Sequence, residues 1–294
     1  MNNQSKSEKW FDRGVHIVLI LICVAVLYPL VFVLMASISS PDAVMRGEVW
    51  LWPKELTMVG YSKIFQNDEI LIGYGNTILY TVVGTAINLV MSIAAAYPLS
   101  RKDFFGRNTI AALLVFTMFF SGGMVPTYLL VKSLGMLNSM WALLIPGAVS
   151  VYNVLIMRTF FQNGIPYEVQ EAASIDGCSN MSTLIRIVLP LSMPIIAVMI
   201  LFYSVGHWNA YFSALIYLTD RDKYPLQLFL REILIQGQMQ EMLGIGDDTQ
   251  SRIVMEGEAI KYAAVIVANL PVLCLYPFLQ KYFVKGVMIG AVKG

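Results

Sequence analysis

Charge is scarce in this sequence. Only 13% of the 294 residues are Asp, Glu, Lys or Arg, and 57% are hydrophobic, whereas an ordinary soluble domain carries about 25% charged residues. A chain with so few charges could not cover the surface of a soluble protein, so lipid must cover part of it. The formal net charge of +1 gives no sign of nucleic acid as a partner. The sequence therefore predicts an integral membrane protein.

Residues for catalysis and metal binding are also scarce. The three cysteines, Cys23, Cys178 and Cys274, are dispersed without metal-site spacing or a disulfide framework, and we interpret them as packing residues. The two histidines, His16 and His207, lie far apart in the sequence. No phosphate-binding G-x-x-x-x-G-K-S/T loop, H-E-x-x-H metal site or G-x-S-x-G nucleophile turn occurs. We therefore expect a chain that is not an enzyme and binds no metal or cofactor itself.

Long hydrophobic runs, in contrast, are abundant, and a membrane-spanning helix needs about 20 mostly apolar residues. The predicted spans cover residues 15–37, 74–99, 109–131, 140–161, 187–218 and 259–283. The first run is longer than the apolar core of a cleaved signal peptide, about 7–15 residues, so it is interpreted as an uncleaved span. The fifth is too long for one simple crossing and contains Pro190 and Pro194 near its start, so its first turns are predicted to bend or to lie at the interface.

The distribution of Lys and Arg predicts the orientation of these six spans. With the N-terminus in the cytoplasm, eleven Lys and Arg residues fall in inside segments and eight in the longer outside segments. Both termini are therefore expected in the cytoplasm, and residues 1–294 are expected to form a single transmembrane domain. Three soluble pieces remain: outside loops 39–73 and 219–258, and a cytoplasmic loop 162–186.

The cytoplasmic loop is predicted to contain two short helices. The first is expected to begin at Pro166, which suits the first helical position, and Gly177 could end it in a left-handed conformation. A second short helix, with Met181, Leu184 and Ile185 on one side, then leads to the fifth span. The loop also contains a spaced pattern: Glu171, Ala172 and Ala173, then Gly177 after three residues, then Ile187, Leu189 and Pro190 after nine more.

This pattern resembles the cytoplasmic loop of bacterial ABC-importer permeases. The segment that begins at Tyr224 and the tail 281–294 are similar to the carbohydrate branch, to its second (maltose-type) permease and, more closely, to permeases for oligosaccharides and polysaccharide fragments of the alginate or plant-polymer type. Cys178 departs from the family, which more often has alanine there. The resemblance implies an all-α membrane protein of type I ABC-importer permease architecture, with six transmembrane helices and a cytoplasmic coupling helix.

In that family the loop docks into a separate ATPase subunit. The residues thereby assigned to ATPase coupling are Glu171, Ala172, Ala173, Asp176, Gly177, Leu189 and Pro190. The resemblance also implies a bacterial inner membrane location and four kinds of partner: a second homologous permease chain, two ATPase subunits that hold ATP and Mg²⁺, an extracytoplasmic sugar-binding protein, and the lipid bilayer. Without the resemblance, the loop would be interpreted as an ordinary helix capped by glycine.

Polar residues within the spans are the candidates for the substrate path, because they are costly in lipid and usually face protein or water. They are His207, Trp208, Asn209, Tyr211, Asn153 and Asn88. Aromatic faces stack on sugar rings, and amides and imidazoles hydrogen-bond to hydroxyls. The same residue types also join neighbouring helices or mark the membrane interface. In the maltose-type family, moreover, the main substrate site can lie largely on the partner permease.

Other functions stay open at this point. A secondary transporter would need an internal repeat and often a buried carboxylate, and no Asp or Glu lies in the middle of any predicted span. A membrane-embedded enzyme is disfavoured by the missing catalytic clusters. An ABC permease for a solute other than sugar is the remaining alternative.

Overall fold

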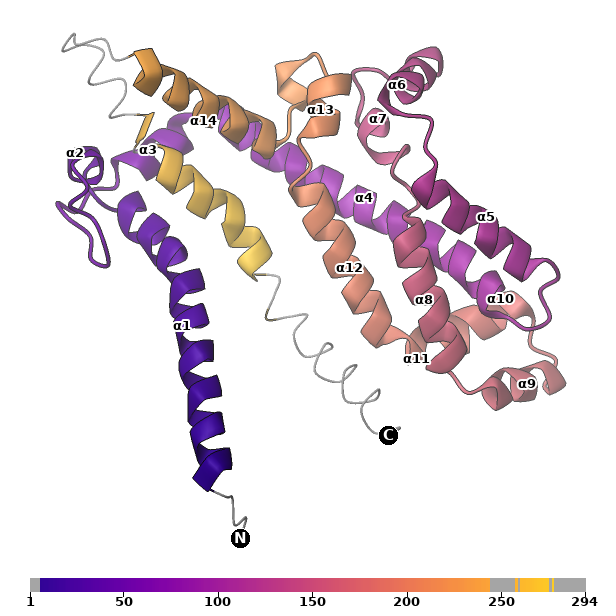
Figure 1. The fold of residues 1–294 in the computed structure, drawn as a ribbon. Helices are drawn as coiled ribbons and strands as arrows, with labels where there is room; N and C mark the ends of the chain where they lie inside the picture. The colour runs from indigo at the N-terminus through magenta and orange to yellow at the C-terminus, as the bar shows by residue number, and fades with distance from the viewer. Residues whose placement is uncertain (1–5, 244–256, 259, 275–276, 278–294) are drawn as a thin grey trace. The chain divides into compact units, whose positions relative to one another are not determined.

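The computed structural model describes residues 6–243, 257–258, 260–274 and 277, and within them regular structure is entirely helical (Figure 1). The helices in chain order are α1 Lys6–Ser37, α2 Pro41–Met45, α3 Val59–Gln66, α4 Asp68–Ser100, α5 Arg107–Phe119, α6 Met124–Ser133, α7 Met140–Leu144, α8 Val151–Asn163, α9 Tyr167–Ile175, α10 Asn180–Thr183, the π-helix η1 Leu184–Val188, α11 Leu189–Leu191, α12 Met193–Trp208, α13 Phe212–Tyr217, the 3₁₀-helix η2 Arg221–Lys223 and α14 Leu226–Leu243. A further apolar helix covers Ile260–Cys274.

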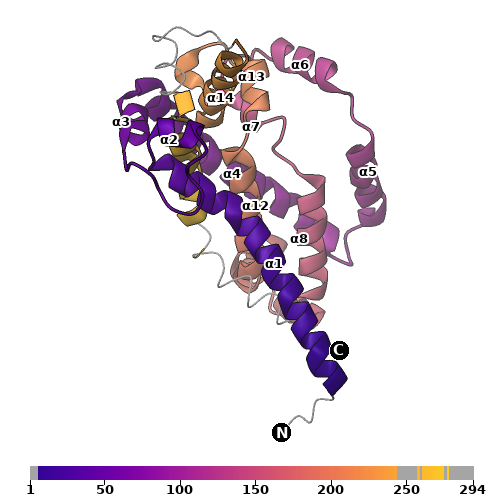
Figure 2. The same ribbon diagram turned by 60° about the vertical axis from the view of Figure 1, so that its left-hand side comes forward.

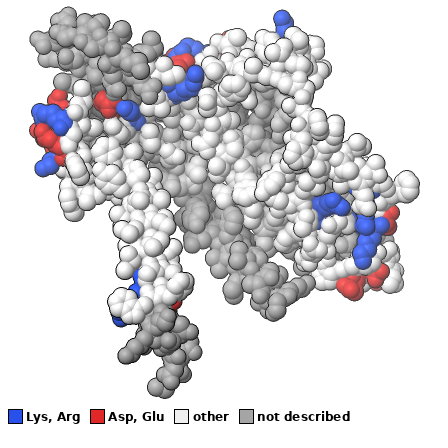
Figure 3. All heavy atoms as spheres, viewed as in Figure 1, with Lys and Arg blue, Asp and Glu red and all other residues white. Residues whose placement is uncertain are grey.

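Among the described residues, two helices are long and apolar enough to cross a membrane as single elements. Within Trp10–Ser37 of α1, an 18-residue window has a mean hydropathy of 3.2, as expected of a helix for which lipid is the solvent. The second, α4, runs unbroken for 33 residues and begins six residues before the predicted span 74–99. Figure 3 shows a surface on which Lys, Arg, Asp and Glu gather in a few patches, with uncharged side chains between them.

Bends divide the other predicted spans. Span 109–131 consists of α5 and α6, which meet at 109° across residues 120–123, where Phe120 is extended and Gly123 has φ +87°. Span 140–161 consists of α7 and α8, separated by a segment that contains Pro146, whose missing N–H ends a helix. The predicted bend at the start of the fifth span lies at Ser192, where α12 departs by 82° from Asn180–Leu191. That span is divided again, because α12 ends at Trp208 before α13 begins.

The chain forms two compact units, 69–229 with 271–294, and 1–68 with 230–270. In the first, α4, α8 and α12 lie side by side, with α9–α11 at one end and α6, α7 and α13 at the other (Figures 1 and 2). Buried apolar residues of α4, α8, the α8–α9 link, η1 and α12 form its main core: Ala96, Tyr97, Leu99, Val154, Met157, Phe161, Ile165, Leu184, Val188, Ile195, Ile196, Met199 and Tyr203. The main core therefore extends to the predicted cytoplasmic loop, since η1 contributes Leu184 and Val188 to it.

The second unit is tied together by short polar links. The hydroxyls of Ser37 and Tyr61 lie 2.8 Å apart, and the backbone N–H of Lys54 donates to the hydroxyl of Ser39 over 3.0 Å. These bonds fold the connection between α1 and α3 back on itself. Residues 278–283 of the predicted sixth span and the tail 281–294 lie outside the described residues.

Candidate functional site

Helix α9 contains the first part of the pattern found in the sequence. It begins at Tyr167, and Pro166 is its N-cap with an extended ψ of 134°, so the predicted start was one residue early. The helix ends in a Schellman motif, with a left-handed glycine after its last turn. Gly177 has φ +77°, its N–H donates to Ser174 O over 3.1 Å, and the N–H of Cys178 donates to Ala173 O over 2.9 Å. The predicted left-handed glycine is confirmed.

One side of α9 is exposed, and it is small and acidic apart from one large apolar residue. Glu171, Ala172 and Asp176 are exposed, and Ile175 is 86% exposed. Ala173 differs from the expectation that it faces a partner with its neighbours, because it is only 4% exposed. Successive helical residues point about 100° apart, so a short helix resting on a protein must turn one of three neighbours inward.

The second predicted helix is shorter and less regular than the sequence pattern indicates. It consists of the four-residue α10, then η1 with π-helical geometry, then the three-residue α11. Leu184 is buried, Met181 and Ile185 are exposed, Leu189 is half-buried, and Pro190 is exposed in the first turn of α11.

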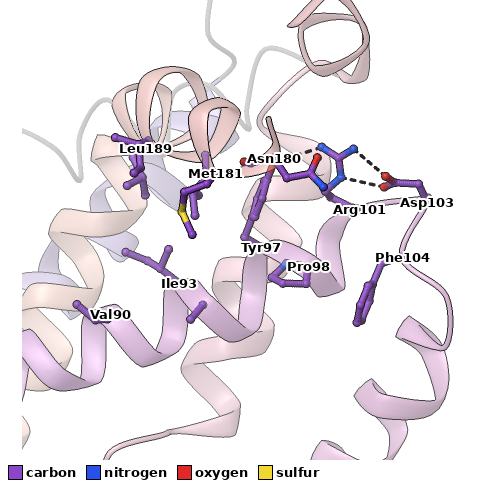
Figure 4. Close-up of a pocket in the computed structure, with 13 residues that line it drawn as sticks. Val90, Ile93, Tyr97, Pro98, Arg101, Asp103, Phe104, Asn180, Met181 and Leu189 are labelled. Atoms are coloured by element: carbon purple, nitrogen blue, oxygen red, sulfur yellow. Dashed lines mark hydrogen bonds and ion pairs between the residues drawn. The ribbon is translucent and has the colours of Figure 1, made fainter. Parts of the chain in front are cut away.

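Polar contacts fasten α9 and α10 to the C-terminal end of α4 (Figure 4). The Tyr97 hydroxyl donates to the backbone oxygen of Asn180 over 3.3 Å, and the Arg101 guanidinium donates to the Tyr97 hydroxyl over 3.2 Å. Arg101 also forms two bonds of 2.8 Å with the Asp103 carboxylate. In the same turn, the Lys102 ammonium lies 4.3 Å from the ring centre of Tyr167.

The ion pair fixes the charges at this junction. Its hydrogen bonds raise the pKa of the Arg101 guanidinium above its ordinary value and lower the pKa of the Asp103 carboxyl below its own. Both groups are therefore charged at neutral pH, and Arg101 is held in one orientation by a bidentate bond.

Below these contacts lies a cavity of about 750 Å³ between α4 and the α10–η1 segment. Figure 4 shows Met181 and Leu189 on one side and Val90 and Ile93 on the other, with Arg101 near the rim. The lining is mostly aliphatic, so water gains little from entering it.

A second polar cluster joins α4, α12 and the segment between α7 and α8. His207 Nε2 lies 2.5 Å from Asn88 Oδ1, and Asn88 Nδ2 donates to the backbone oxygen of Gly147 over 2.7 Å. Gly84 makes room for the ring, since a Cβ there would lie 2.5 Å from His207 Nε2. The structure thus brings together two of the predicted substrate-path residues, His207 and Asn88, as a bridge between helices.

The other predicted substrate-path residues do not join this cluster. Trp208 is 4% exposed and packs edge-on against Tyr74 at a centroid distance of 5.6 Å, so here it is a core residue rather than an exposed aromatic. Asn209 donates to Val205 O over 2.9 Å and so caps α12. Asn153 is 7% exposed in the first turn of α8, whereas Tyr211 is 41% exposed.

Residues 9–289 match the family model described as the binding-protein-dependent transport system inner membrane component. The chain belongs to this family. It is therefore an inner membrane component of a transport system, with the type I ABC permease fold.

Two relatives from Bacillus subtilis (strain 168) are 42% identical to this permease. One is Protein LplC, aligned over 266 residues that cover 90% of this chain and 89% of the relative. The other is the polygalacturonan/rhamnogalacturonan transport system permease protein YtcP, aligned over 292 residues that cover 98% and 99%. Similarity thus extends over nearly the whole length of both chains.

A solved structure shares the fold of the permease. It is a chain of a bacterial ABC transporter involved in the import of the acidic polysaccharide alginate, with a TM-score of 0.86 and 30% sequence identity. The match covers 96% of this permease and 100% of that chain.

The contacts at the end of α4 are the part of the site that sequence reasoning missed. From the sequence, Arg101 and Lys102 are only two of the eleven inside Lys and Arg residues that set the orientation, and Tyr97 is only part of span 74–99. The sequence offered one signal for this junction: Tyr97, Arg101 and Lys102 follow one another at i, i+4 and i+5 where the apolar run of span 74–99 ends. Their partners, Asn180 and Tyr167, are too distant in sequence to be found by periodicity.

Proposed function

We propose that this permease is a transmembrane subunit of an ATP-driven importer of carbohydrates, most specifically of oligosaccharides. A relative that transports polygalacturonan or rhamnogalacturonan and a solved importer of alginate both support this substrate class. A more distant relative, 27% identical, is an arabinooligosaccharide transport permease. The common chemistry of these substrates is a chain of linked sugars.

The exposed side of α9 is the observation that carries the coupling role. A short helix that presents Glu171, Ala172 and Ile175, and that ends at a fixed glycine stop, suits a cleft on a separate ATPase. A rigid element of this kind can transmit a rigid-body movement. We therefore assign ATP and Mg²⁺ to two partner ATPase subunits and no catalytic activity to this chain.

The remaining partners follow from the same assignment. A second homologous permease chain would complete the translocation pathway, and an extracytoplasmic sugar-binding protein would deliver the substrate. The chain would cross the inner membrane six times as a single domain, with both termini in the cytoplasm. On this chain Tyr211 is a candidate for sugar contact because its side chain is 41% exposed.

Purification of the tagged chain from its native membranes tests the proposal. We expect two ATPase subunits and a second permease to co-purify, and the complex in proteoliposomes to take up oligogalacturonides only with ATP and the binding protein. Omission of ATP is the control. A chain that transports sugar alone would instead be a secondary carrier, and uptake of another solute class with no sugar uptake would overturn the carbohydrate assignment.

A further inference from the structure

We propose that α4 is the helix through which the α9–α10 loop drives the transmembrane unit, with Tyr97 and Arg101 as the positioning residues that fasten loop and helix. This inference rests on the proposed function, in which α9 contacts the ATPase. It assigns the main route of movement to side-chain contacts with α4 rather than to the chain that continues from the loop into α12.

The continuous chain is a compliant route. Between α9 and α12 it passes through one turn of α-helix, the π-helix η1 and an 82° bend at Ser192. Pro190 and Pro194 flank that bend and donate no backbone hydrogen bond. In the described part of the protein, the buried Ser192 hydroxyl has no hydrogen-bond partner, so it does not stiffen the bend. A push on α9 would bend this segment before it moved α12.

The contacts with α4 form a shorter and stiffer route. The loop is held at two places: at Tyr167, by the Lys102 ammonium 4.3 Å from its ring, and at the Asn180 carbonyl, by the Tyr97 hydroxyl. The bidentate bond to Asp103 prevents Arg101 from turning away from Tyr97. The Tyr97 ring is itself packed in the core, since it is 5% exposed and lies edge-on to Phe161.

The cavity beneath these contacts strengthens the assignment. Apolar side chains of α4 and of α10–η1 line about 750 Å³ of space instead of closing on each other. Packing across this part of the joint is therefore incomplete. Leu184 and Val188 of η1 share the main core with α4, and the polar contacts at the rim complete the attachment of the loop to the helix (Figure 4).

From Tyr97 a movement reaches the polar cluster directly. Helix α4 is unbroken, and Asn88 lies nine residues before Tyr97, about 14 Å along the same helix. Asn88 holds both His207 and the Gly147 carbonyl in the break between α7 and α8. Displacement of one end of α4 would thus move the α7–α8 break and the end of α12 together.

The test uses the assembled transporter with Tyr97→Phe and Arg101→Gln. The matched control is Tyr80→Phe, which removes an equivalent hydroxyl bond to a backbone carbonyl, that of Lys223, seventeen residues before Tyr97 on the same helix. We expect Tyr97→Phe and Arg101→Gln to lower sugar taken up per ATP hydrolysed by about fivefold or more, the usual lower range of coupling between sites. Tyr80→Phe should leave that ratio unchanged, and Arg101→Lys should restore part of it.

A distance measurement separates transmission from simple destabilisation. One spin label is attached to native Cys178 in the loop, and a second to Phe105→Cys in the turn between α4 and α5, in a background of Cys23→Ser and Cys274→Ser. Both sites are exposed, so the distance between the labels reports the separation of the loop from that turn. In the parent complex the separation should stay constant when ATP binds, and in the Tyr97→Phe and Arg101→Gln variants it should change. An unchanged uptake ratio with a constant separation in both variants overturns the inference. If the parent complex shows no ATP-driven uptake, the proposed function fails, and this inference fails with it.

Discussion

Gly84 shows how one missing side chain permits a contact between two helices. A Cβ at this position would lie 2.5 Å from His207, whereas a Cβ at Gly75 of the same helix would meet no atom within 4 Å. We expect Gly84→Ala to displace the imidazole from Asn88 and to destabilise the permease by about 1–3 kcal/mol, the usual cost of overpacking. Gly75→Ala is the control and should be neutral or slightly stabilising. Thermal denaturation of the purified complex compares the two, and equal midpoints would contradict the assignment.

Gly177 illustrates a different constraint, since a Cβ there would meet no atom within 4 Å but the backbone has φ +77°. A β-branched residue in this conformation costs about 1–2 kcal/mol or more. We expect Gly177→Val to lower both uptake and transport-linked ATP hydrolysis while the chain still inserts. Gly47→Val, at φ +71° with equally open surroundings, imposes the same strain outside the loop and should preserve uptake. Normal uptake by a normally expressed Gly177→Val permease would refute the role of this turn.

At the scale of elements, α4 and α12 are joined by two side-chain hydrogen bonds one helical turn apart. Ser92 and Tyr203 hydroxyls lie 2.5 Å apart, and Asn88 meets His207 four residues away on each helix. We expect Ser92→Ala to cost about 1 kcal/mol or more, because it leaves the buried Tyr203 hydroxyl unpaired. Ser192→Ala is the matched control, since in the described residues its buried hydroxyl has no partner. Ser192→Ala should leave stability unchanged or raise it. Similar losses of stability in both variants would contradict a stabilising role for the Ser92–Tyr203 hydrogen bond.

Across the whole molecule, α4 fixes which ends lie on opposite sides of the membrane. Its 33 residues measure about 50 Å, more than the roughly 30 Å of the hydrocarbon core. With the native cysteines replaced by serine, a cysteine at Gln66 should react with an impermeant thiol reagent from outside. Cysteines at Phe105 or Ser179 should react only after the membrane is opened. Labelling of Gln66 and Phe105 from the same side would contradict the topology.

The sequence revealed elements more readily than the contacts between them. Hydropathy located α1 and α4, and a single glycine in a short loop was enough to predict the stop at Gly177. The breaks at Gly123 and Pro146 were missed because apolar residues on both sides keep the local hydropathy high. The partnership of Asn88 with His207 joins residues 119 positions apart, and periodicity gives the face of a helix but never its partner.

The close approach at Gly84 also has an evolutionary consequence. Any larger residue at this position would collide with the His207 ring, so the two positions cannot drift independently. A lineage that replaces His207 with a small residue loses the constraint on position 84, and a lineage that gains a side chain at position 84 must displace or lose the imidazole. Among descendants of a common ancestor, glycine at 84 and histidine at 207 should therefore be inherited, and lost, as a pair.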